Sequence, residues 1–192
     1  FESSTMTAAA AGTFTDGQEV KYDDYFTLYM SAKTKIDSSE KVWDDGYTSG
    51  QRLNLGGKAD LSAMKNVMSF KTSGAATVKI WWVEGGDDHR ELGIFTADGA
   101  EVTKTTEGAG AAKNGILMST LSLAEAGTYF LGGTPNNNYI FKVEVEESAA
   151  AATSEYVFES NKLEAAAAGT YPDGQEVKYD DYFTLYMSAK TK

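Results

Sequence analysis

The sequence predicts an all-β protein, built as an antiparallel β-sandwich or jelly roll of about ten short strands. Three observations indicate this fold class. Apolar and polar residues alternate with a period of two in most apolar runs, as in strands with one buried face. The runs are short, and turn-forming residues separate them. Glycine is frequent, with 19 residues, whereas proline occurs only twice, which suits strands joined by glycine turns.

The predicted strands follow one another along the chain. Asp98-Gly99 lies between two β-prone runs and predicts a hairpin. Ala124–Gly127 predicts a short turn between two further strands. The segment Leu61–Phe70 fits either a short helix or a strand, and we expect it to be extended. The strand candidates are Tyr25–Met30, Gln51–Gly57, Ala76–Val83, Glu91–Val102, Gly115–Leu123, Gly127–Gly133 and Tyr139–Glu146.

Two of these strands predict which side chains face outward. In Ala76–Val83 the alternation leaves Lys79 and Trp81 on the outer face, and the inward residues are Val78, Ile80 and Trp82. In Tyr139–Glu146 the same reasoning leaves Ile140, Lys142 and Glu144 outward. The inward residues predicted there are Tyr139, Phe141, Val143 and Val145.

A 35-residue segment occurs twice, as Phe1–Lys35 and as Phe158–Lys192, at a constant offset of 157 residues. We call these the first copy and the second copy. They are identical at 29 of 35 positions and differ at Ser4/Asn161, Thr5/Lys162, Met6/Leu163, Thr7/Glu164, Phe14/Tyr171 and Thr15/Pro172. An offset of domain size predicts tandem modules. We therefore expect a β-sandwich at 1–147, a linker at 148–157 and the truncated start of a second module at 158–192.

The second copy has the same alternation as the first, so it fits the place of the first copy in any neighbouring module. We expect 158–192 to pair with an exposed sheet edge or to exchange with the equivalent segment of another module.

Composition excludes several classes of function. A net charge of −11 argues against general nucleic-acid binding and against adsorption to an anionic membrane surface. The chain has no cysteine, which excludes disulfides, cysteine nucleophiles and thiolate metal sites but not secretion. No apolar run is long enough for a membrane span.

No catalytic constellation stands out, and we predict that the protein is not an enzyme. The only histidine, His89, could act as a general base beside Asp87, Asp88 or Glu91, but a single loop histidine is more often a surface residue. There is neither a nucleophile elbow nor a phosphate-binding glycine loop. We expect no cofactor.

Acidic residues could hold a structural Ca²⁺ ion. Asp44 and Asp45, in the Asp44–Gly46 turn, are the best candidates for such a site, because calcium prefers oxygen ligands. The turn lacks EF-hand spacing, so the expectation is weakly specified.

Five residues stand out as candidates for ligand binding. Lys79 and Lys142 lie on the outward faces of well-patterned strands, and Trp81 shares a face with Lys79. Arg90 follows a glycine-aspartate loop, and Lys113 precedes another strand. An outward aromatic ring beside cations can hold an acidic sugar, because the ring packs on the apolar sugar face and the cation pairs with the carboxylate. Trp81 could equally pack under a loop.

Three runs carry a family resemblance. They are "WDDGYTSGQRLNLGG" (Trp43–Gly57), "SGAATVKIWWVEGGDDHRELGIF" (Ser73–Phe95) and "GTYFLGGTPNNNYIFKVEV" (Gly127–Val145). Over roughly Tyr25–Val145 the chain resembles the pectin-binding carbohydrate-binding modules (family seventy-seven type) of secreted bacterial pectinolytic proteins.

The resemblance implies a β-sandwich without catalytic activity that binds homogalacturonan through surface basic residues. Lys79 and Lys142 are the best matches to such residues, followed by Arg90, with Lys113 weaker. It also implies a polysaccharide partner and a place outside the cell or on a bacterial cell surface, within a multimodular protein.

Two other readings stay open. The chain could be a structural tandem repeat or adhesin module of a surface protein, a reading that an array of near-identical copies would favour. It could also be a small polysaccharide lyase or glycosidase, although it shows no sign of a substrate-spanning cleft.

Overall fold

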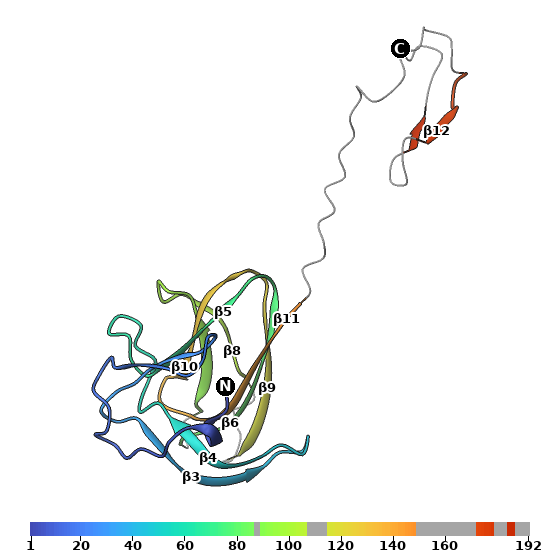
Figure 1. Cartoon of the computed structure of the whole chain (residues 1–192). Coiled ribbons are helices and arrows are strands. Elements are labelled where there is room, and N and C mark those ends of the chain that lie inside the picture. Colours follow the sequence, from blue (N-terminus) through green and yellow to red (C-terminus); the bar gives the residue numbers. More distant parts are fainter. Residues whose placement is uncertain (87–88, 107–114, 149–171, 179–183, 187–192) are drawn as a thin grey trace. The chain divides into compact units, whose positions relative to one another are not determined.

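The computed structural model describes residues 1–86, 89–106, 115–148, 172–178 and 184–186 (Figure 1). The chain divides into two compact units, Phe1–Ala151 and Ala152–Lys192. The domain boundaries expected at 147 and 157 stay predictions.

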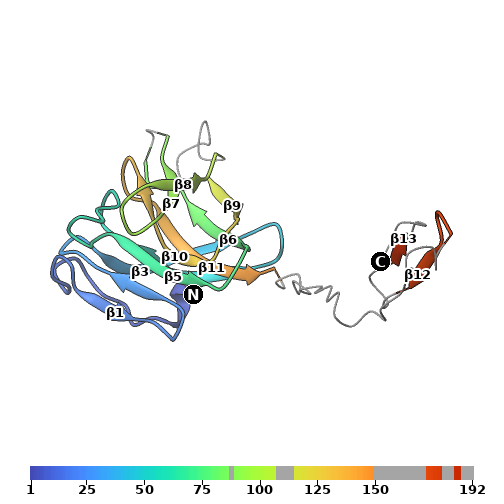
Figure 2. The ribbon, with the colours of Figure 1, turned by 90° about the horizontal axis from the view of Figure 1, so that it is seen from above.

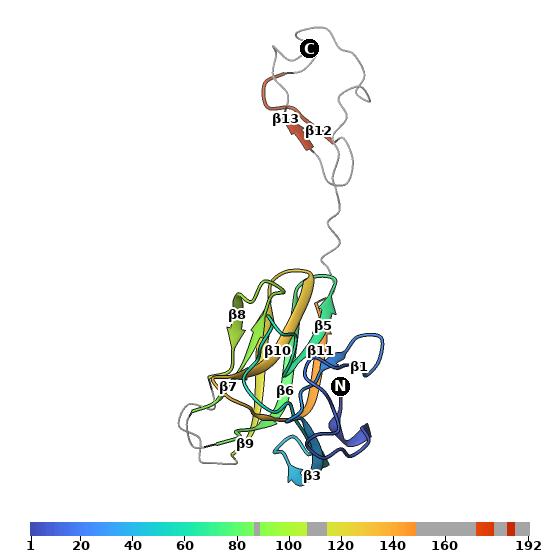
Figure 3. The same cartoon turned by 90° about the vertical axis from the view of Figure 1, so that its left-hand side faces the viewer.

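The first unit is an antiparallel β-sandwich, which confirms the predicted fold class (Figures 1 and 2). Five strands form sheet A in the order β3-β4-β11-β6-β9. Six strands form sheet B in the order β1-β2-β5-β10-β7-β8. Figure 3 shows β7 and β8 on one side of β10, and β5 and β1 on the other. The elements of this unit are η1 (Ser3–Thr5), β1 (Glu19–Lys21), β2 (Thr27–Tyr29), β3 (Lys35–Val42), β4 (Thr48–Asn54), β5 (Val67–Thr72), β6 (Ala76–Val83), β7 (Glu91–Phe95), β8 (Glu101–Lys104), β9 (Ile116–Leu123), β10 (Gly127–Thr134) and β11 (Tyr139–Glu147).

The main core lies between the two sheets and follows the period-two pattern. Leu28, Leu53 and Trp82 are each 0% exposed and come from three different strands. Their neighbours along the strands, such as Arg52 and Trp81, point away from this core. Burying large apolar side chains from both sheets is the main term that stabilises a sandwich.

Two predicted turns are confirmed. β7 pairs with β8 across the turn that contains Asp98 and Gly99, and Gly99 has a φ of +87°, a conformation that glycine adopts without strain. β9 ends at Leu123 and β10 begins at Gly127. The expectation that 61–70 is extended is correct only from Val67, where β5 begins, and wrong for 61–64, which form a turn.

The predicted faces of β11 are correct for half of the strand and wrong for the other half. The pairing of β11 with β6 shifts between Ile140 and Lys142, which is a β-bulge at Phe141. One extra residue reverses the faces on one side of the bulge. Ile140 therefore joins the main core, whereas Tyr139 and Phe141 lie on the outer face of sheet A. Lys142 and Val143 lie as predicted.

The first three residues complete sheet A beside this bulge. β4 pairs with β11 only at Tyr139 and Ile140. Beyond that point Phe1 and Val143 exchange two backbone hydrogen bonds, each 3.0 Å long. Ser3 Oγ donates to the carbonyl of Gln51 on β4 (2.7 Å), so the segment Phe1–Ser3 lies between the two strands. The first copy is thus an integral part of the sandwich.

In the second unit, the described residues form one hairpin of β12 (Glu176–Lys178) and β13 (Thr184–Tyr186). It repeats the β1–β2 pairing at the offset of the two copies: Glu176 pairs with Tyr186, as Glu19 pairs with Tyr29.

Candidate functional site

The outer face of sheet A carries a second, smaller cluster of apolar side chains, which we call the outer cluster. It exists because β6 and β11 present large side chains outward and the turn between β3 and β4 folds over them. Trp43 Nε1 donates to the carbonyl of Leu117 on β9 (2.8 Å), which ties the turn to the far edge of the sheet. The outer cluster consists of Trp43, Tyr47, Trp81, Val83, Tyr139 and Phe141.

Trp81 faces outward as predicted, but its ring is only 4% exposed. Its Nε1 donates to Oδ2 of Asp45 (2.8 Å), and Tyr47 packs edge-on against it with ring centroids 5.8 Å apart. The ring is therefore covered by the β3–β4 turn, and it offers no free face to a sugar. Packing under a loop, the second reading considered for Trp81, describes its position.

Lys142 lies at the boundary of the outer cluster. Its Nζ is 4.6 Å from the ring centre of Trp81 and 5.1 Å from that of Tyr47, so both rings attract the ammonium through cation–π contacts. Nζ also pairs with Glu144. About a quarter of the side chain (24%) is exposed.

Lys79 lies on the neighbouring strand of the same face. Its Nζ pairs with Glu146 at 3.0 Å, and 34% of the side chain is exposed. In the β6–β11 pairing Trp81 is opposite Lys142 and Lys79 is opposite Glu144, so the two lysines are diagonal neighbours. The structure thus brings together two cations that are 63 residues apart in the sequence.

Arg90 does not join the two lysines. It precedes β7, and its guanidinium donates to the carbonyl and the Oδ1 of Asn137, both at 3.1 Å. Its backbone N–H donates to the buried carboxylate of Glu84 (2.7 Å). These bonds hold the loop after β6 against the loop between β10 and β11. Lys113 lies outside the described residues.

Asp44 and Asp45 lie in the β3–β4 turn, as predicted. Asp45 Oδ1 accepts the N–H of Tyr47 (2.9 Å) and Oδ2 accepts Trp81 Nε1. The first of these bonds contributes most to lowering the pKa of Asp45, followed by the second. Among the described residues no group of three or more His, Asp or Glu side chains is arranged to hold a metal ion. The calcium site stays a prediction.

Sequence reasoning missed the two aromatic residues that close the site, Trp43 and Tyr47. Burial raises the pKa of Tyr47 to about 12, and its hydroxyl donates to Glu2 Oε1 (3.3 Å). An aromatic residue on each side of the Asp44–Gly46 turn was the available signal. It could not show that the turn folds over β6, because that contact joins segments distant in sequence.

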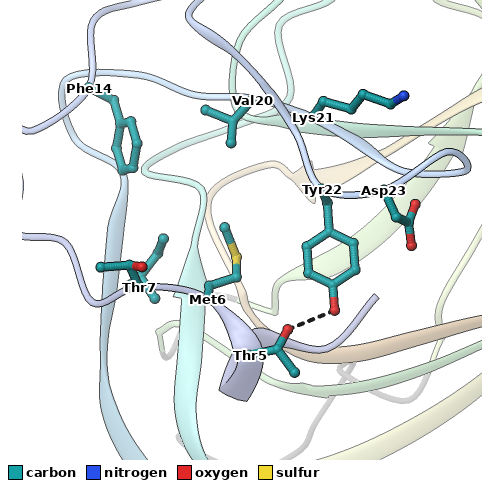
Figure 4. Close-up of a pocket in the computed structure, with 9 residues that line it drawn as sticks. Thr5, Met6, Thr7, Phe14, Val20, Lys21, Tyr22 and Asp23 are labelled. Atoms are coloured by element: carbon teal, nitrogen blue, oxygen red, sulfur yellow. Dashed lines mark hydrogen bonds between the residues drawn. The ribbon is translucent and has the colours of Figure 1, made fainter.

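A hollow beside the first copy contains a lysine, Lys21, that is paired with an aspartate (Figure 4). Tyr22 Oη accepts the N–H of Glu2 (3.0 Å) and shares a hydrogen bond with Thr5 Oγ1 (2.8 Å), and Lys21 pairs with Asp24 (2.8 Å). These groups hold the N-terminal segment in place. The hollow is lined by Thr5, Met6, Thr7, Phe14, Val20, Lys21, Tyr22, Asp23 and Ile36.

Comparisons with known proteins add little. No protein-family model matches the chain, and no curated protein matches it. A solved structure described as "The complexity of the Ruminococcus flavefaciens cellulosome reflects an expansion in glycan recognition" is similar with a TM-score of 0.39 and 18% identity, over 65% of this chain and 82% of that chain. Similarity at this level does not establish a common fold and carries no argument about function. Within the described part of the chain, no helix has the length and apolarity that crossing a bilayer requires.

Proposed function

We propose that the first unit is a non-catalytic carbohydrate-binding module that recognises an acidic plant polysaccharide, pectin or homogalacturonan, outside the cell or at a bacterial surface. One observation carries the proposal: Lys79 and Lys142, each inside a run that resembles pectin-binding modules, project from adjacent strands onto one face of sheet A. An acidic chain with a net charge of −11 needs such a local group of cations to hold a polyanion.

The neighbouring glutamates do not block this role. Each ammonium has three N–H donors. Lys79 forms an ion pair with Glu146, and Lys142 forms one with Glu144. Exposed ion pairs contribute only about 0–1 kcal/mol, so a galacturonate carboxylate can share or replace them. The cation–π contacts of Lys142 hold its ammonium in place before the ligand arrives.

The binding expected from this arrangement is weak for one module and falls with salt. Several weak pairs repeated along a polymer add through multivalency, and tandem modules would extend the same effect. Screening by salt acts on exposed pairs most strongly, so 0.5 M salt, at a Debye length of about 4 Å, should abolish most retention.

Affinity electrophoresis of the full chain in gels with and without polygalacturonic acid tests the proposal. We expect retardation by the polymer, and Lys79→Ala should weaken it by about 1.4- to 5-fold, the range for one exposed ion pair. Lys104→Ala on β8 is the matched control, because it removes the same charge from a lysine paired with Glu91 on the other sheet. Unretarded migration, or equal effects of the two substitutions, would contradict the proposal.

A second candidate function rests on the repeat. Two copies identical at 29 of 35 positions suit a structural array or adhesin in which each module is a spacer. The same gels separate the candidates, because a spacer module migrates alike with and without polymer.

A further inference from the structure

Tyr25 presents an aromatic ring to solvent in a way that Trp81 does not. Its side chain is 73% exposed, the highest value among the large apolar side chains described in the first unit. It lies in the turn between β1 and β2, where Asp23 Oδ1 accepts the N–H groups of Tyr25 (2.8 Å) and Phe26 (2.6 Å). The carboxylate thus fixes the backbone of the turn, and the ring projects from a rigid base.

A pocket of about 370 Å³ lies beside this ring. Its floor contains Phe26 and Phe70, which are 6% and 1% exposed, with ring centroids 6.1 Å apart. A volume of this order is at the small end of ligand sites. The full lining is Tyr25, Phe26, Phe70, Lys71, Val145 and Glu147.

Lys71 also lines the pocket and supplies a cation there. The pairing of β2 with β5 places Thr27 opposite Ser69. Tyr25 lies two residues before this pair on one side and Lys71 two residues after it on the other, and both line the pocket. Lys71 is exposed and forms no ion pair with any residue that the structure describes, in contrast with Lys79 and Lys142.

Glu147 forms the remaining polar wall. Its carboxylate accepts hydrogen bonds from the backbone N–H (2.8 Å) and the hydroxyl of Ser73. These bonds lower the pKa of Glu147, so it stays ionised at neutral pH. A ligand carboxylate is therefore repelled from this wall and attracted to Lys71, while Glu147 can accept a bond from a sugar hydroxyl.

We propose that this pocket is a second glycan-binding site, in which a uronic acid residue packs on the ring of Tyr25 and pairs its carboxylate with Lys71. The aromatic ring and the apolar floor of the pocket can pack against the apolar face of such a sugar. The lysine can pair with the sugar carboxylate, and the glutamate can accept a hydrogen bond from a sugar hydroxyl. The inference deepens the proposed function, since it rests on the module binding acidic glycans. It assigns part of that binding to the end of the sandwich rather than to sheet A.

Titration of the full, isotope-labelled chain with trigalacturonic acid, followed by amide NMR, tests it. We expect shift changes at Tyr25, Phe26 and Lys71. Tyr25→Ala should weaken the binding seen at Lys71 by about 2- to 10-fold, the worth of an aromatic contact, whereas Tyr25→Phe keeps the ring and should retain it. Lys71→Gln should weaken it by about 1.4- to 5-fold.

Matched controls separate the pocket from general effects. Tyr186→Ala removes an equally exposed tyrosine (71%) from the second unit, and Lys35→Gln removes an exposed lysine from β3. Neither should change the shifts at Lys71. The methyl ester of the same oligosaccharide should bind more weakly there, because it lacks the charge.

The outcomes distinguish the two proposals. Shift changes confined to the neighbourhood of Lys79 and Lys142 would overturn this inference and leave the proposed function intact. Changes confined to Tyr25 and Lys71 would support it and remove sheet A from the binding surface. Equal binding of acid and ester at the pocket would refute the pairing with Lys71, and no change anywhere would refute both proposals.

Discussion

Asp45 links the acidic β3–β4 turn to the face that carries the lysines. One of its carboxylate oxygens accepts the N–H of Tyr47 and the other accepts Trp81 Nε1. Both bonds favour the ionised form and lower the pKa of Asp45. The ionised carboxylate of this residue therefore contributes to holding the turn over Trp81, together with the packing of the outer cluster.

The sign of the pH effect follows from this direction. A carboxyl group whose pKa is lower in the folded protein stabilises the fold above its ordinary value of 3.8, and that contribution is lost as the pH falls through the folded pKa. We predict that the indole N–H resonance of Trp81 titrates with a midpoint below 3.8. NMR between pH 2 and pH 6 measures it.

The neighbouring aspartate provides the control. Asp45→Asn should abolish this titration, whereas Asp44→Asn should leave it unchanged, because no hydrogen bond joins Asp44 to Trp81 among the described contacts. A titration that persists in Asp45→Asn would show that another carboxyl group controls the indole.

Residue by residue, the sequence could predict which face of a strand a side chain lies on, but not whether another segment buries that side chain. The alternation in β6 correctly placed Lys79 and Trp81 outward. It could not show that Trp81 is buried, because the covering residues, Trp43 and Tyr47, come from a turn more than thirty positions earlier. For the same reason the alternation does not indicate a site at Tyr25 and Lys71. These two residues line one pocket because β2 pairs with β5.

At the scale of elements, strands could be predicted where side chains alternate without interruption. β6 matches its predicted faces. β11 does not, because the bulge at Phe141 adds one residue that no pattern of apolar residues announces. The bulge has a consequence for the site: it places Phe141 in the outer cluster while Lys142 stays on the same outer face.

The end of β4 offers a direct test of how backbone geometry sets this arrangement. Gly56 has a φ of +97°, and a Cβ there would lie 2.8 Å from both the carbonyl carbon of Lys33 and Ser31 Oγ. We predict that Gly56→Ala destabilises the first unit by about 1–3 kcal/mol, since both the left-handed backbone and the close contact oppose a side chain. Urea denaturation followed by tryptophan fluorescence measures the loss.

Gly50, within β4, is the matched control. A Cβ there meets no atom within 4 Å, so Gly50→Ala should change the stability by no more than about 0.5 kcal/mol. Equal losses from the two substitutions would mean that the contacts around Gly56 relax freely and that the turn between β2 and β3 is not fixed by them.

At the scale of the whole molecule, the two copies share the residues that the first copy buries in the sandwich. The buried residues of the first copy, among them Ser3, Leu28 and Met30, have identical counterparts in the second. None of the six differing positions is buried, and four of them line the hollow in Figure 4. The fully buried residues are thus kept, whereas the differing positions are exposed or half-buried, with Met6 and Phe14 packed at the margin of the core.

Equal packing means that connectivity decides which copy is bound. The first copy joins β3 through a few residues, so little loop entropy opposes its docking, whereas the second copy must dock through a longer linker or from another chain. We propose that the first copy fills the place in the native protein and that the second can replace it when the first is weakened.

Leu28→Ala tests this replacement, because truncating a fully buried leucine costs about 2–5 kcal/mol. If the second copy takes over with its intact Leu185, the melting temperature of Leu28→Ala should stay above that of Leu28→Ala/Leu185→Ala, and Leu185→Ala alone should have no effect. If the melting temperature of the single variant depends on protein concentration, the exchange occurs between chains. If it does not, the replacement occurs within one chain. Identical melting of the single and double variants would show that no replacement occurs, since Leu185 would then contribute nothing to the sandwich.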